Sequence, residues 1–98
     1  MDEPSLDDPL APVEVEIRAL IVGWRQTLGG PPKNDLTQAL IATYNTLDRR
    51  EAQIAQLQPN VQYAAPLRET LEGLLVERDR LRTRLADLYT RWRAVYGA

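Results

Sequence analysis

Few residues in this chain could perform chemistry, because it contains no cysteine and no histidine. Thiolate metal sites, cysteine nucleophiles and imidazole acid–base catalysis are therefore excluded. The only serine, Ser5, lies in an acidic, proline-rich stretch with no candidate base near it in the sequence. Gly29-Gly30 is followed by two prolines, which lack the N–H groups that a phosphate-binding loop uses. We therefore expect no enzyme, no cofactor and no metal site.

The charged residues are distributed unevenly, although the net charge is only −2. Residues 1–16 hold six acidic and no basic residues, whereas residues 77–93 hold six arginines and three acidic residues. This predicts attraction between an acidic head and a basic tail, within one chain or between two chains. Most simply the arginines form a solvated helix flank. The least neutralised of them, Arg84, Arg91 and Arg93, are candidate phosphate contacts if this helix binds nucleic acid.

A heptad pattern of apolar residues runs through the C-terminal third of the chain. Its gaps alternate between four and three residues, which places one stripe along a helix for a partner helix. The stripe consists of Leu67, Leu71, Leu74, Arg78, Leu81, Leu85, Leu88, Trp92 and Val95. Arg78 is its one charged member, so the pattern predicts helix pairing with a specificity-setting charge inside the interface.

Local signals divide the chain into a lead-in and one helical domain. We predict a flexible acidic segment at residues 1–11, a single domain at residues 12–98, and helices at about 12–28, 35–58 and 66–96. Pro12 and Pro66 suit the first turns of helices. Gly29-Gly30 with the following prolines ends the first helix, and Asn34 or Asp35 begins the second.

The connector of residues 59–65 is short enough to join antiparallel neighbours. In one register Leu40 faces Leu85, and Glu51 lies in the layer beside Arg78. These two charges would then satisfy each other and set the register of the interface. We therefore predict an all-α fold, an antiparallel coiled-coil helical hairpin with an additional N-terminal helix. A parallel homodimer through the third helix would stack Arg78 on Arg78 and is less favourable.

Further apolar residues beside the heptad, Leu75, Tyr89 and Tyr96, widen the face of the third helix. The first helix is too short to cover this face, so we expect a homodimer or higher oligomer. Trp92 lies on an apolar stripe and is most simply a core anchor. The register above sets it against Lys33 in a loop, which makes it also a candidate exposed contact for a partner.

Together these patterns predict a protein–protein interaction module: an adaptor, an assembly factor or a structural subunit with a heterologous protein partner. The chain has no basic leader with an apolar core and no apolar run near 20 residues, so we expect a cytoplasmic protein that does not enter a membrane. The alternative is a nucleic-acid-associated regulator that uses the arginine-rich helix face. Phosphate contacts would weaken steeply with salt, which distinguishes the two hypotheses.

Overall fold

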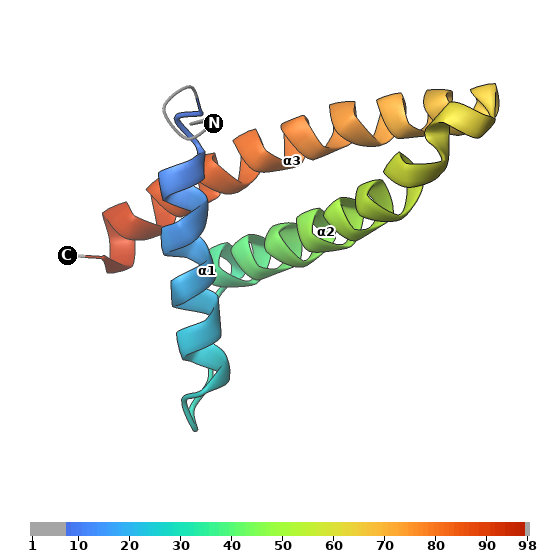
Figure 1. Ribbon diagram of the computed structural model, residues 1–98. Coiled ribbons are helices and arrows are strands. Elements are labelled where there is room, and N and C mark those ends of the chain that lie inside the picture. Colours follow the sequence, from blue (N-terminus) through green and yellow to red (C-terminus); the bar gives the residue numbers. More distant parts are fainter. Residues whose placement is uncertain (1–7, 98) are drawn as a thin grey trace.

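Within residues 8–97, which the computed structural model describes, the chain folds into three α-helices and a 3₁₀ helix. The elements are α1 (Ala11–Arg25), α2 (Asp35–Leu57), η2 (Gln58–Tyr63) and α3 (Ala65–Tyr96). α2 and α3 form an antiparallel hairpin, and α1 crosses it near the end where α2 begins and α3 ends (Figure 1). The predicted all-α hairpin with an additional N-terminal helix is confirmed. Of the flexible segment predicted at residues 1–11, residues 1–7 fall outside the described residues. In the rest, Asp8 forms an ion pair with Arg82 and α1 begins at Ala11.

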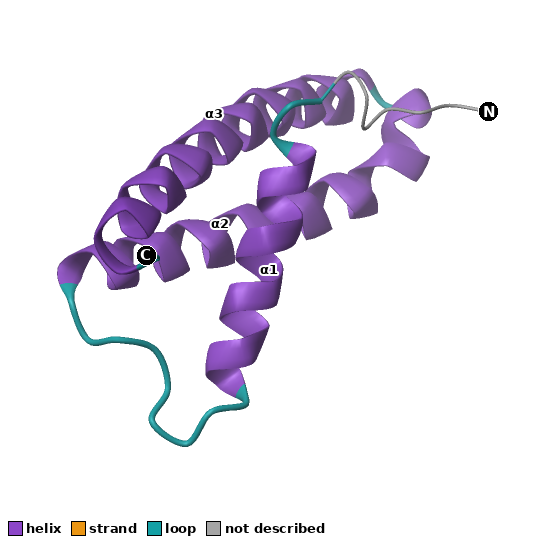
Figure 2. Cartoon of the chain, turned by 90° about the vertical axis from the view of Figure 1, so that its left-hand side faces the viewer, coloured by secondary structure: helices purple, strands orange, loops and turns teal. Residues whose placement is uncertain are grey.

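The helix ends follow the local chemistry of the sequence. Asn34 caps α2, since its Oδ1 accepts a hydrogen bond from the backbone N–H of Thr37 at 2.8 Å. α1 ends at Arg25, three residues before the end that we expected, and the chain continues as a loop (Figure 2). Gly30 in this loop has a φ of 70°, which favours glycine. Leu28, the last residue of the first helix as predicted, lies in this loop and is fully exposed.

The core lies where α1 crosses the hairpin, at what we term the closed end. Ile17 and Ile21 of α1 are buried with Leu40 of α2 and Leu85 of α3. The buried apolar cluster consists of Ile17, Ile21, Leu40, Leu47, Leu85, Leu88 and Trp92. Burial of one such side chain is worth about 1.5–3 kcal/mol. α1 therefore completes the core of its own hairpin.

Trp92 joins the three helices at the closed end. Its indole N–H donates a hydrogen bond to Thr37 Oγ1 at 3.0 Å, and both side chains are buried. Trp24 of α1 packs edge-on against its ring, with centroids 5.4 Å apart. Trp92 is therefore buried as the core anchor that its apolar stripe indicated. α2 covers the ring one helical turn beyond Lys33, which leaves little of it exposed for the alternative, a partner contact. The last turn of α3 extends past the start of α2, which leaves Val95 62% exposed.

The predicted contact between Glu51 and Arg78 is wrong. Arg50 donates from Nε to Glu77 Oε2 of α3 at 2.8 Å, whereas Arg78 donates to its neighbour Asp79. Glu51 is exposed. The buried or half-buried stripe of α2 consists of Leu36, Leu40, Thr43, Leu47, Arg50, Ile54 and Leu57. It places Arg50, rather than Glu51, between the helices.

Replacement of Thr37 by valine should destabilise the fold, because the indole N–H of Trp92 would stay buried without an acceptor. A buried donor left without its partner costs about 1–3 kcal/mol, and valine keeps the shape of threonine. Urea unfolding followed by circular dichroism measures this loss. Thr83→Val, at an exposed position of α3, is the matched control and should change the free energy of unfolding by less than about 0.5 kcal/mol. Equal losses in both variants would contradict the role of this hydrogen bond.

Candidate functional site

Beyond α1 the hairpin continues as a layer of only two helices, residues 48–80, which we term the arm (Figure 1). Four leucines of α3 on the arm are half-buried: Leu67, Leu71, Leu74 and Leu75. Val76 of α3 and Tyr63 of η2 are 51% and 75% exposed. A single layer of helices cannot enclose its own apolar side chains. The arm therefore carries apolar surface without a packing partner, and it is the candidate interaction site.

The structure separates the residues that widen the apolar face of α3. The hydroxyl of Tyr89 donates a hydrogen bond to Glu16 Oε1 of α1 at 3.0 Å, and its ring stacks on Trp92. Burial, and secondly the bond to Glu16, raises the pKa of Tyr89 above its ordinary value. Leu75 lies on the arm and Tyr96, 46% exposed, lies at the other end of α3. Only Leu75 belongs to the open arm.

Arg82 binds the N-terminal part of α1 to α3. Its Nη2 donates to Asp8 Oδ2 at 2.5 Å and to Glu14 Oε1 at 3.2 Å, and its Nε donates to the second oxygen of Glu14. The Arg82 side chain is only 17% exposed. Farther along α3, Arg93 Nη1 lies 3.5 Å from Glu16 Oε1. The attraction expected between acidic head and basic tail thus operates within one chain.

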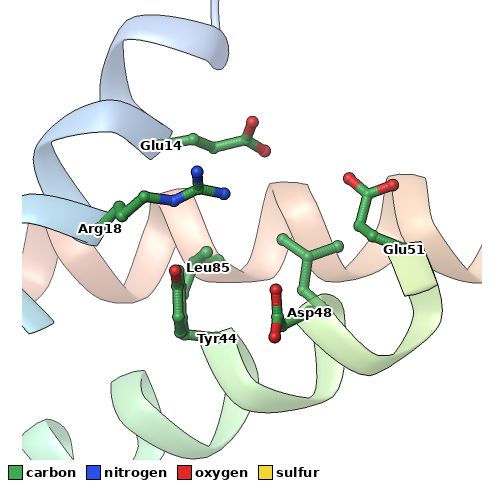
Figure 3. A pocket seen from close by; sticks show the side chains of 7 residues that line it. Glu14, Arg18, Tyr44, Asp48, Glu51 and Leu85 are labelled. Atoms are coloured by element: carbon green, nitrogen blue, oxygen red, sulfur yellow. The ribbon is translucent and has the colours of Figure 1, made fainter. Parts of the chain in front are cut away.

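A cavity of about 50 Å³ lies where α1 meets the base of the arm. Figure 3 shows Glu14 and Arg18 of α1 opposite Asp48 and Glu51 of α2, with Leu85 of α3 nearby. This volume holds a few water molecules and is far below the roughly 300–1,000 Å³ of small-molecule sites. The cavity marks the point where the interface between α1 and the hairpin opens onto the arm.

The three predicted phosphate contacts have different surroundings. Arg91 pairs with Asp87 of its own helix at 3.1 Å, and Arg93 lies 3.5 Å from Glu16. Arg84 is exposed and has no ion pair within residues 8–97. Carboxylates of the same chain therefore neutralise much of the positive charge on α3, which weakens attraction to a polyanion.

No protein family, curated protein or solved structure matches this chain. In the part that the structure describes, no three potential ligand side chains gather in a way that could hold a metal ion. None of the described helices is both long and apolar enough to cross a bilayer. The features of the described chain that bear on function are therefore the arm and the way α1 closes the opposite end.

Replacement of Arg82 by glutamine should loosen α1 from the hairpin, because it removes the ion pairs with Asp8 and Glu14. Hydrogen bonds to charged groups contribute about 1.5–3 kcal/mol, and partial exposure reduces the expected loss to about 1–2 kcal/mol. Hydrogen–deuterium exchange should then become faster in α1 and stay unchanged in the arm. Arg84→Gln removes an arginine without an ion pair in the described chain and serves as the control. Identical exchange in the two variants would rule out this role of Arg82.

Low pH should weaken the ion pair between Arg82 and Asp8. The hydrogen bond from Arg82 holds the pKa of Asp8 below its ordinary value of 3.8. A carboxyl group with a lower pKa in the folded state stabilises the fold above that ordinary value, and this contribution disappears as the pH falls through the folded-state pKa. We therefore expect the protection of α1 to decline below pH 3.8. In Asp8→Asn this part of the acid dependence should be absent; an unchanged acid profile would argue against the contact.

Proposed function

We propose that this chain is a non-catalytic protein–protein interaction module, an adaptor, assembly factor or structural subunit that acts in the cytoplasm through helix pairing. The observation that carries the proposal is a difference in burial within one heptad pattern. Leu85 and Leu88 are buried at the closed end, whereas Leu71 and Leu74 on the arm are half-buried. An apolar stripe that lacks cover on part of its length is typical of a surface for another helix.

Two further observations support this proposal. The sequence has no cysteine or histidine for catalysis. The cavity at the base of the arm has a volume of only about 50 Å³, and the larger hollows along α1 and α3 are more open to solvent. The nucleic-acid hypothesis has less support, because Arg91 and Arg93 lie within ion-pair distance of carboxylates of the same chain. Homo-oligomers and heterologous complexes both remain within the proposal, since either supplies helices to the arm.

Affinity capture from the native host, followed by mass spectrometry, tests the proposed function. Leu75→Glu places a charge on the arm and should abolish protein capture, whereas Thr83→Glu, on an exposed position beyond the arm, should leave it unchanged. Capture should persist as salt rises from about 0.1 M to about 0.5 M, since apolar burial releases no counterions. Capture that is lost with salt, with nuclease treatment and in Arg84→Glu would favour the nucleic-acid hypothesis instead.

A further inference from the structure

The two faces of the arm carry different side chains. On one face Arg50 donates hydrogen bonds to Glu77 at 2.8 Å and to Gln53 at 3.0 Å, so polar contacts close this face. Leu75 lies two residues before Glu77, about 200° away around the helix. It lies seven residues, or two turns, before Arg82, on the side of α3 that binds α1. The surface that α1 covers at the closed end therefore continues along the arm, with a half-buried leucine.

The side of α2 that faces α1 at the closed end also continues along the arm. Asp48 and Glu51 line the cavity beside α1. Ala55 of α2 and Gln58, the helical cap residue that directly follows α2, come seven residues after them and so lie on the same side, and both are exposed. The face of the arm formed by Leu75, Ala55 and Gln58, termed the open face, is thus an extension of the existing contact between α1 and the hairpin.

We propose that a second copy of this chain covers the open face, with the two arms packed antiparallel as two layers of two helices each. α1 lies across this face at the closed end of each hairpin (Figure 1). Parallel arms would bring two α1 helices into the same space, whereas antiparallel arms place the tip of each arm beside the partner's α1. This inference rests on the proposed function and names the partner.

The charge of the arm suits a second copy rather than a strongly charged partner. Residues 48–80 contain five basic and six acidic residues, interspersed along both helices. The net charge of this segment is therefore −1, so it offers little attraction to a polyanion or a polycation. Two such arms repel each other only weakly, and Arg78 and Asp79, which lie four and three residues before Arg82 on the same side of α3, form an ion pair with each other at 3.1 Å.

The size of the open face predicts a weak dimer. α3 contributes about 16 residues to the arm, which corresponds to a length of about 24 Å. Two packed helices have a width of about 20 Å. Each copy would bury roughly 500 Å², or about 1,000 Å² for the pair, near the lower limit of specific interfaces. Dissociation in the micromolar range is therefore expected.

Single cysteines test the partner and the orientation together, because the chain has none of its own. Asp48→Cys and Gln58→Cys place thiols on the open side of α2 and of the residue that caps its end, five positions either side of residue 53. Antiparallel arms predict that a mixture of the two variants forms the 48–58 disulfide in preference to 48–48 or 58–58. Predominant 48–48 or 58–58 products would overturn the antiparallel dimer.

The matched controls for this experiment are Arg49→Cys and Gln56→Cys. Both positions are exposed and point more than about 100° away from the centre of the open side of α2. Their mixture should cross-link about tenfold more slowly than the first pair, at the rate of random collisions. Equal rates for the two pairs would show that no specific interface forms at the open face, and would overturn the proposal.

Sedimentation velocity measures the association without cross-linking. The 11.1 kDa chain should become a dimer as its concentration rises through the micromolar range. Leu75→Glu should raise the dissociation constant by about tenfold or more, because it buries a charge in the interface. Ala55→Glu changes an exposed residue and makes the same test if Leu75→Glu does not fold. Thr83→Glu is the control.

The outcomes separate this inference from the proposed function. A chain that stays monomeric at all concentrations, while capture of a heterologous protein still depends on Leu75, overturns the dimer and leaves the interaction module intact. A monomer that also captures no protein overturns both. Dimerisation that is sensitive to Leu75→Glu and Ala55→Glu, with the 48–58 disulfide as the main product, supports both.

Discussion

The burial of Trp92 determines how the three helices fit together. Once its ring leaves water, the indole N–H requires an acceptor, and Thr37 in the first turn of α2 provides one at 3.0 Å. This bond sets the position of α3 along α2. Because Trp24 packs edge-on against the same ring, α1 is placed by it as well. A shift of α3 by one turn would break the hydrogen bond and the aromatic contact together, so this side chain selects one register for the closed end.

The direction of α1 then explains why the arm stays open. α1 runs across the hairpin, and its 15 residues span about 22 Å, close to the width of two packed helices. Its beginning is tied to α3 through Arg82 and Glu14, and its end reaches α2 through a 3.4 Å hydrogen bond from Arg25 to Asn45. A helix fixed at both edges of the hairpin cannot also lie along it. The length of α1 and its two polar anchors therefore leave the arm without a third helix.

The sequence reveals the elements better than the contacts between them. Helix ends depend on residues close by in the sequence, such as the cap residue Asn34. The helix bounds and the short connector between the second and third helices were therefore enough to predict the hairpin. The stripe of α2 that packs on α3 could not, because it contains the polar residues Thr43 and Arg50. Gaps of four and three between Leu40, Leu47 and Ile54 are met equally by Thr43 and Arg50 or by Tyr44 and Glu51, which lie about 100° farther around the helix. The preference for the apolar Tyr44 therefore brought Glu51, rather than Arg50, into the predicted interface.

Charge and apolar surface are divided between the two ends of the molecule. Asp8, Glu14 and Glu16 lie against arginines of α3, so the acidic head neutralises the basic tail inside one chain. What remains on the arm is a nearly neutral surface with half-buried leucines such as Leu71 and Leu75. Such a surface gives little long-range steering, because steering requires a field of one sign. Recognition by the arm must therefore depend on apolar burial and shape at short range, with ordinary rather than electrostatically accelerated association rates.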